Sequence, residues 1–181
     1  GDNAPVELPW TILLHDIAKP ATAAVGKDGR IHNYGHDKLG AKMAEDILRR
    51  LKFPRKQIDA IVFTVLKHMN LAAAPKMRKA KLRRMMLRPT FELELEQHRI
   101  DCLGSHRKSD IYDFLRAEQA ALADQPALLE PLVTGSDLIE LGIEPGPSMG
   151  RLLNEIRDRQ LAEEFSTREV ALAWAKEKAA Q

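Results

Sequence analysis

Apolar residues recur every three or four positions along almost the whole chain, which is the spacing that gathers side chains on one face of an α-helix. No stretch alternates apolar and polar residues convincingly, and no repeat of fixed length occurs. We therefore predict an all-α fold. The clearest amphipathic segment spans residues 36–51, and the face that we expect to be buried carries Leu39, Met43, Ile47, Leu48 and Leu51.

Proline, glycine and small polar residues predict where the helices begin and end. A helix over residues 9–19 should end at Pro20, because a proline inside a helix removes a hydrogen bond and clashes with the preceding turn. Three glycines make residues 20–35 a loop, with a short hairpin around Asp28-Gly29. Further helices are expected over residues 54–68, 76–87, 89–103 and from Ser109-Asp110 onward.

A change of composition near residue 124 divides the chain. Residues 123–131 contain two prolines among polar neighbours, which is typical of a connector. We expect a helical domain at residues 5–123 and a small helical C-terminal module at residues 130–179. The last helix of the module should begin at a capping box, in which the Ser166 hydroxyl accepts a hydrogen bond from the Glu169 N–H.

Composition sets bounds without naming a function. The chain has 181 residues, of which 44% are hydrophobic and 30% charged, as in a soluble globular protein. Because the net charge is only +2, contact with nucleic acid would have to come from local basic patches. The single cysteine excludes an internal disulfide. The apolar runs are too short to span a bilayer and residues 1–5 hold no signal core, so we expect a cytoplasmic protein with no membrane partner.

His15-Asp16 follows an apolar run at the end of the first predicted helix. Imidazole and carboxylate together suit a divalent metal ion, although an aspartate can also merely orient a buried histidine. A buried carboxylate without a partner is costly, so Asp16 needs a cation, hydrogen-bond donors or water. Lys19 follows by one turn and could hold a phosphate oxygen.

Three other histidines and one aspartate could each have a functional or a purely structural role. His36 and His68 lie at predicted helix ends, where functional side chains can converge, yet either could simply bind a helix-end backbone group. His98 is more typical of a satisfied helix residue than of a ligand. Asp101, one turn later, could pair with an arginine nearby.

Residues 76–88 contain seven basic side chains and no acidic one. Such a segment favours a phosphate-rich partner, and the alternative is a solvated face above buried leucines and methionines. Aromatic residues make up only 5% of the chain, which argues against a base-stacking platform. The expected mode is contact with the backbone of a nucleic acid.

Several short motifs, in this order, resemble the HD domain of bacterial tRNA nucleotidyltransferases and poly(A) polymerases. The resemblance covers residues 10–175 and implies an HD-domain-like helical bundle followed by a small, RNA-binding-like C-terminal module. The motifs lie at residues 15–20 (His-Asp-Ile-Ala-Lys-Pro), 34–41, 47–53, 67–69, 82–84, 98–106, 132–138 and 145–150.

The resemblance implies a divalent metal ion, magnesium, manganese or nickel. The superfamily's ligands are a histidine on an upstream helix, a His-Asp pair and a late aspartate, and the last three map to His15, Asp16 and Asp101. No histidine precedes residue 10, and Ala18 stands where the family usually has glycine.

The resemblance also implies that the chain is a C-terminal fragment. The nucleotidyl-transferring domain of the family carries a Gly-Ser motif and an Asp-x-Asp pair, and the chain has no Asp-x-Asp. We expect the fragment to bind and position tRNA or RNA for 3′-end addition by that missing N-terminal domain. The alternative is a metal-dependent phosphohydrolase acting on 2′,3′-cyclic phosphate ends, assisted by Lys19 and His68. The residues expected to contact phosphate are His36, Lys76, Arg78, Lys79, Lys81, Arg83, Arg84 and Arg88.

Overall fold

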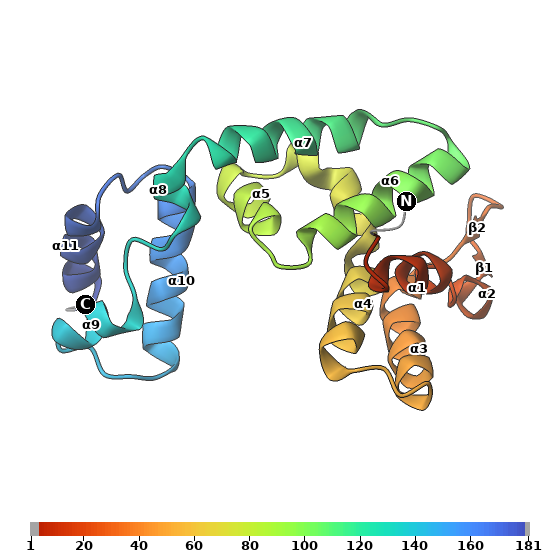
Figure 1. The fold of residues 1–181 in the computed structure, drawn as a ribbon, viewed down its shortest axis with the longest axis horizontal. Coiled ribbons are helices and arrows are strands. Elements are labelled where there is room, and N and C mark those ends of the chain that lie inside the picture. Colours follow the sequence, from red (N-terminus) through yellow and green to blue (C-terminus); the bar gives the residue numbers. More distant parts are fainter. Residues whose placement is uncertain (1–3, 180–181) are drawn as a thin grey trace. The chain divides into compact units, whose positions relative to one another are not determined.

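The computed structural model describes residues 4–179, and this part of the chain is helical apart from one short hairpin and the connecting turns (Figure 1). The predicted all-α class is therefore confirmed. Residues 1–3 of the N-terminal stretch, where we expect no signal core, lie outside the described residues. None of the helices within residues 4–179 is both long enough and apolar enough to cross a bilayer.

Close contacts divide the chain into two compact units. Unit 1 comprises the residues up to Pro75 together with Pro89–Phe114, and unit 2 comprises Lys76–Arg88 together with the residues from Leu115 onward. The units thus interleave in sequence, whereas the predicted domains at 5–123 and 130–179 follow one another. The division into domains at residues 5–123 and 130–179 stays a prediction.

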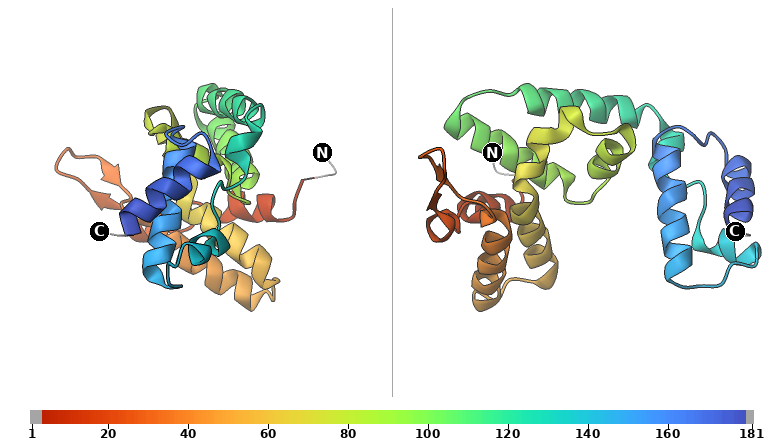
Figure 2. Two further views of the ribbon diagram at one scale, coloured as in Figure 1. Left: turned by 90° about the vertical axis from the view of Figure 1, so that its left-hand side faces the viewer. Right: turned by 180° about the vertical axis from the view of Figure 1, so that it is seen from behind.

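Unit 1 is built from helices around one apolar core. Its elements are α1 (Glu7–Leu14), α2 (Lys19–Thr22), β1 (Ala24–Val25), β2 (Ile31–His32), α3 (His36–Arg50), α4 (Arg55–Lys67), most of the 3-10 helix η1 (His68–Lys76), α6 (Phe91–Ser105) and the start of α7 (Asp110–Ala123). Helices α3 and α4 lie side by side as a hairpin in every view (Figure 2). The buried core residues are Leu14, Ala41, Ala44, Leu48, Ile58, Ile61 and Val65.

The buried face of α3 matches the predicted one only in part. Leu48 is buried and Met43 and Ile47 are half-buried, but Leu39 and Leu51 are exposed. The other buried positions carry a histidine and small residues: His36, Gly40, Ala41 and Ala44. The small residues let neighbouring backbones approach closely: a Cβ on Gly40 would already lie 3.7 Å from the Ala18 Cβ. Close helix contact therefore selects the face with small side chains, and larger ones border it.

Pro20 has the opposite role to the predicted one. Helix α1 ends at Leu14, with His15 as its C-cap, and Pro20 lies in the first turn of α2. Proline is tolerated there because the first N–H groups of a helix have no intrahelical partner. His15 and Asp16 consequently lie in the turn between two helices.

The hairpin predicted around Asp28-Gly29 is present. Strands β1 and β2 pair antiparallel, with Ala24 opposite His32. Gly29 has a φ of 73°, a left-handed conformation that glycine adopts at no steric cost.

Unit 2 is centred on the long helix α10 (Pro147–Leu161), which contacts α5 (Lys79–Met86), α9 (Gly135–Glu140) and α11 (Arg168–Ala179). The end of α7 and the short α8 (Pro126–Leu129) complete the unit. Its core residues are Val133, Leu138, Met149, Ile156, Phe165, Ala171 and Ala175.

The helix caps of unit 2 differ in part from the prediction. Helix α11 begins at Arg168, so the capping hydroxyl belongs to Thr167, which accepts from the Val170 N–H at 3.4 Å, and the prediction for Ser166 was wrong by one residue. A full capping box occurs instead at α9, between Thr134 and Asp137.

Candidate functional site

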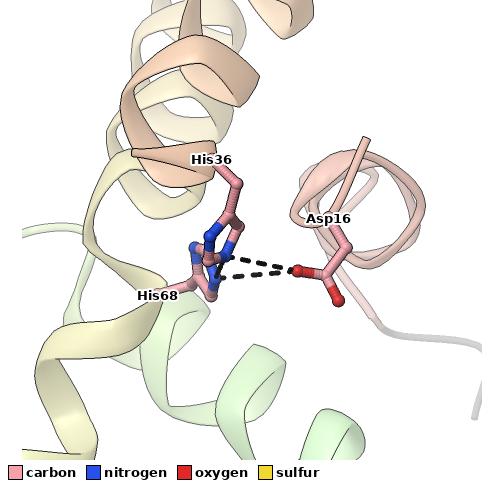
Figure 3. Close-up of side chains that lie close together, drawn as sticks. All are labelled: Asp16, His36 and His68. Atoms are coloured by element: carbon pink, nitrogen blue, oxygen red, sulfur yellow. Dashed lines mark hydrogen bonds and ion pairs between the residues drawn. The ribbon is translucent and has the colours of Figure 1, made fainter. Parts of the chain in front are cut away.

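Three side chains from separate parts of unit 1 converge on one point (Figure 3). Asp16 comes from the turn after α1, His36 is the first residue of α3, and His68 follows the last turn of α4. The Asp16 Oδ1 lies 3.5 Å from the His36 Nε2 and 3.9 Å from the His68 Nε2. The two Nε2 atoms are 3.1 Å apart. These ligand atoms all lie within 4.8 Å of one another, close enough to share a metal ion.

Backbone carbonyls orient the imidazoles of this cluster. Because a carbonyl oxygen can only accept, each bonded Nδ1 carries the proton, and a neutral ring then has a bare lone pair on Nε2. Histidines that bind metals are commonly held in this way. Each ring donates to the carbonyl three residues earlier: His15 to Ile12 at 2.8 Å, His36 to Asn33 at 2.7 Å and His68 to Val65 at 2.7 Å.

The charge state of His68 makes this geometry unfavourable without a cation. Burial lowers the pKa of His68, and the neighbouring His15 and His36 lower it further, so the ring is neutral at neutral pH. The bare Nε2 of His68 therefore lies 3.1 Å from the His36 Nε2, and the Asp16 Oδ1 is buried without a hydrogen-bond partner among the described residues. An unpaired buried acceptor is costly, and a divalent ion could bind the Asp16 Oδ1 together with the two Nε2 atoms. The donor set therefore fits a metal ion.

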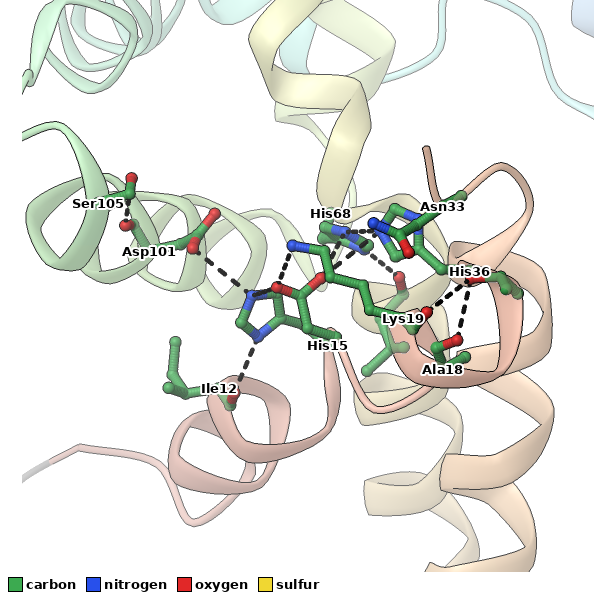
Figure 4. A network of polar contacts seen from close by, with 12 residues as sticks. Ile12, His15, Ala18, Lys19, Asn33, His36, His68, Asp101 and Ser105 are labelled. Carbon is green, nitrogen blue, oxygen red and sulfur yellow. Dashed lines mark hydrogen bonds and ion pairs between the residues drawn. The ribbon is translucent and has the colours of Figure 1, made fainter. Parts of the chain in front are cut away.

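Two side chains contact the other oxygen of Asp16, and Figure 4 shows both of them, Lys19 and His15, close to the histidine pair. The Lys19 Nζ donates to the Asp16 Oδ2 at 2.6 Å, and the His15 Nε2 lies 3.1 Å from the same oxygen. The His15 Nε2 also lies 3.5 Å from the Asp101 Oδ1 of α6. One carboxylate oxygen thus faces the histidine pair, and the other faces a lysine.

The structure brings the predicted metal ligands close to one another, but only Asp16 belongs to the three-residue cluster. His15, Asp16 and Asp101 are in contact, but Asp101 reaches the cluster only through His15. His36, predicted to contact phosphate, and His68, predicted to assist a reaction, stand beside Asp16 as potential ligands. Sequence reasoning did not identify these two as ligands, although their position at helix ends was the signal that could have found them.

Ala18 fits its position without strain. It is fully buried and has a φ of −92°, which any residue adopts. The alanine in place of the family's usual glycine therefore leaves the turn that carries His15 and Asp16 intact.

The basic segment of unit 2 contains two kinds of cation. Lys76, Arg78 and Lys81 are exposed, and no ion pair or hydrogen bond joins their side chains to other described residues. Lys79 is also exposed but pairs with Glu163, and this contact is the main reason why the pKa of that carboxyl is lowered. Three unneutralised charges therefore remain on one short stretch of surface.

Two arginines of α5 bind this helix to α10 and to the turn that follows α10. The Arg83 side chain is only 7% exposed and donates to the Leu161 carbonyl at 2.8 Å and to Glu163 at 3.2 Å. Arg84 pairs with Asp158 at 2.7 Å. Arg88 is half-buried and donates to the Met85 carbonyl. These charges stabilise unit 2 itself.

Comparison with known proteins identifies a family that this chain matches. The model of the family described as tRNA nucleotidyltransferase domain 2 matches residues 36–175. The chain is 33% identical to the A-adding tRNA nucleotidyltransferase of Deinococcus radiodurans, over 97% of this chain and 43% of that protein. It is 30% identical to the CC-adding tRNA nucleotidyltransferase of Thermus thermophilus, over 95% of this chain and 40% of that protein.

The chain spans about two fifths of the length of these two relatives. No solved protein structure matches it. The family model nevertheless covers most of the sequence, including the helices that carry His36 and His68 and the whole basic segment. The chain therefore belongs to the tRNA nucleotidyltransferase domain 2 family.

Proposed function

We propose that this chain is the RNA-holding region of an enzyme that adds nucleotides to the 3′ end of tRNA. The transfer itself would be carried out by a nucleotidyltransferase domain of the same protein, N-terminal to this segment. Two relatives carry names that state addition of A or CC to tRNA, and each is more than twice as long as the stretch that this chain matches. Family membership supports tRNA as the partner.

The exposed cations Lys76, Arg78 and Lys81 are the observation that carries the proposal. Their charges meet no acidic side chain among the described residues, so they attract counterions or the phosphates of a partner. Contacts of this kind read the shape and backbone of RNA rather than its sequence. The partnered residues Lys79, Arg83 and Arg84 hold α5, the helix that carries Lys81 and follows Arg78. We expect these residues and Arg88 to contact RNA only at the edge of this surface.

Filter binding of tRNA to the whole chain across a series of salt concentrations tests this function. We expect the logarithm of the affinity to fall linearly with the logarithm of the salt concentration, because bound phosphates release counterions. No binding, or an affinity that does not change with salt, contradicts the proposal.

We further propose that Asp16, His36 and His68 hold a divalent ion, with His15 and Asp101 in support. Magnesium, manganese and nickel are the candidates, and the imidazole-rich donor set favours nickel over magnesium and manganese. A bound ion would act as a Lewis acid towards a phosphate oxygen. Lys19 stands at the same carboxylate and would offer a second positive charge to that phosphate.

A metal-dependent phosphohydrolase is the second candidate function, and the convergence of Asp16, His36 and His68 favours it. The test is hydrolysis of a 2′,3′-cyclic nucleotide with each of the three metals. Hydrolysis that disappears in His15→Ala and His68→Ala, yet persists in a variant of the exposed His106, would support this candidate. Turnover no faster than that of the metal alone would exclude it.

A further inference from the structure

A pair of stacked aromatic rings stands on the hairpin next to the candidate metal centre. The rings of His32 and Tyr34 are nearly parallel, at 8°, with centroids 5.1 Å apart. Tyr34 is 82% exposed, the highest value among the exposed large hydrophobic residues that the structure describes. Its ring is thus supported by His32 and otherwise open to solvent.

The supporting ring is itself held in place. The His32 Nε2 donates to the Asp28 carboxylate at 2.9 and 3.1 Å, and the same carboxylate accepts from the Arg30 N–H at 3.1 Å. The hydrogen bond from His32 is the main reason why the pKa of Asp28 is lowered. Gly26 leaves the space that this arrangement needs, because a Cβ there would lie 2.6 Å from the His32 Cδ2. The hairpin therefore presents Tyr34 on a fixed support.

The position of Tyr34 connects the stacked pair to the metal centre. Tyr34 precedes His36 by two residues, and the Asn33 carbonyl orients the His36 ring. Two residues span at most about 7 Å of backbone, so the backbone that carries Tyr34 lies close to that of the candidate ligand His36. Lys27 and Arg30 of the same hairpin are exposed and make no side-chain ion pair with other described residues. An exposed aromatic ring and two exposed cations on one short segment suit a nucleotide, which has a planar base and an anionic phosphate.

We propose that Tyr34 stacks on the unpaired base at the 3′ end of a bound RNA, with Lys27 and Arg30 beside its phosphate. This inference rests on the proposed RNA-holding function and names the site on unit 1 that would receive the end of the RNA. The low aromatic content of the chain, which argued against a base-stacking platform, does not exclude it, because one ring on a rigid support suffices for one base. Stacking tolerates any base, so no sequence preference is expected.

The test uses the whole chain and an RNA hairpin whose unpaired 3′-terminal base is 2-aminopurine, a fluorescent base that is quenched when it stacks. We expect the wild-type chain to quench this fluorescence. Tyr34→Ala should abolish the quenching and weaken binding roughly 5- to 150-fold. Tyr34→Phe keeps the ring and should behave like the wild type. An RNA with an abasic 3′ terminus should bind wild type and Tyr34→Ala equally well, which controls for misfolding of the variant.

The outcomes separate the inference from the function on which it rests. If the wild type binds RNA and Tyr34→Ala quenches equally well, the stacking site is wrong while RNA binding stands. If Tyr34→Phe loses as much quenching as Tyr34→Ala, the ring is not the contact and the inference fails. If the wild type binds no RNA at low salt, both the inference and the proposed function fail.

Discussion

At the scale of single residues, the candidate metal centre depends on how backbone carbonyls orient the histidines. The sequence predicted His15, Asp16 and Asp101 as metal ligands, and the structure places His15 in contact with both aspartates. The convergence of the two other candidate ligands, His36 and His68, could not be predicted, because the 3.1 Å between their Nε2 atoms depends on how the start of α3 packs against the end of α4. No local pattern encodes that packing.

His68→Ala tests whether this centre binds a metal ion. Loss of one ligand should lower the affinity of the chain for nickel at least about tenfold. Isothermal titration calorimetry measures this affinity. The matched control is His106→Ala, which removes an exposed histidine outside the cluster and should leave nickel binding unchanged. Equal affinities in the two variants would mean that the ion does not bind at this centre.

At the scale of elements, helix α5 shows what a basic pattern can and cannot predict. The burial of Leu82, Met85 and Met86 beneath the basic residues agrees with helical spacing. The burial of Arg83 does not follow from spacing, because its partners Leu161 and Glu163 lie about 80 residues away in sequence. The sequence pattern suggests that Arg83 could contact RNA, but its side chain stabilises unit 2 instead.

Arg83→Ala should destabilise the chain by about 1–3 kcal/mol, because it leaves the buried Leu161 carbonyl without its donor. Lys81→Ala removes an exposed charge without a partner and should change stability by less than about 0.5 kcal/mol. Urea unfolding midpoints compare the two variants. A neutral Arg83→Ala would show that the contacts of this arginine do not stabilise unit 2.

The capping box of α9 makes stability depend on pH. Pairing with Arg168 at 2.6 Å is the main cause that lowers the pKa of Asp137 to about 2, from its ordinary 3.8, and bonds from Thr134 add to it. A lowered pKa in the folded state stabilises the fold above about pH 4, and this contribution is lost as the pH falls towards about 2.

Asp137→Asn should therefore unfold at lower urea concentration than the wild type near pH 7, since the amide cannot pair with Arg168 as an anion. The difference should shrink as the pH is lowered from about 4 towards about 2. Glu144→Gln, which removes the charge of an exposed acid that makes no side-chain ion pair with other described residues, is the control for general loss of a surface negative charge. A gap between wild type and Asp137→Asn that stays constant with pH would argue against this ion pair as the cause.

At the scale of the whole molecule, helical periodicity predicted the all-α class and most helix positions. It did not predict that Lys76–Arg88 joins unit 2 ahead of the rest of that unit. The contacts of α5 with α10 join segments far apart in sequence, and such pairings depend on packing rather than on local propensity. Similarly, Pro20 marks a helix boundary in the sequence, but only the fold shows that it begins a helix.

The central claim is that this chain holds RNA through the exposed cations of its basic segment. The most direct test compares the salt dependence of tRNA binding for the wild type and for the triple variant Lys76→Ala, Arg78→Ala, Lys81→Ala. Each lost phosphate contact reduces the log–log slope by about 0.7 to 0.9, so the triple variant should bind more weakly, with a slope shallower by about 2 to 3. An unchanged slope and affinity in the triple variant would contradict the claim.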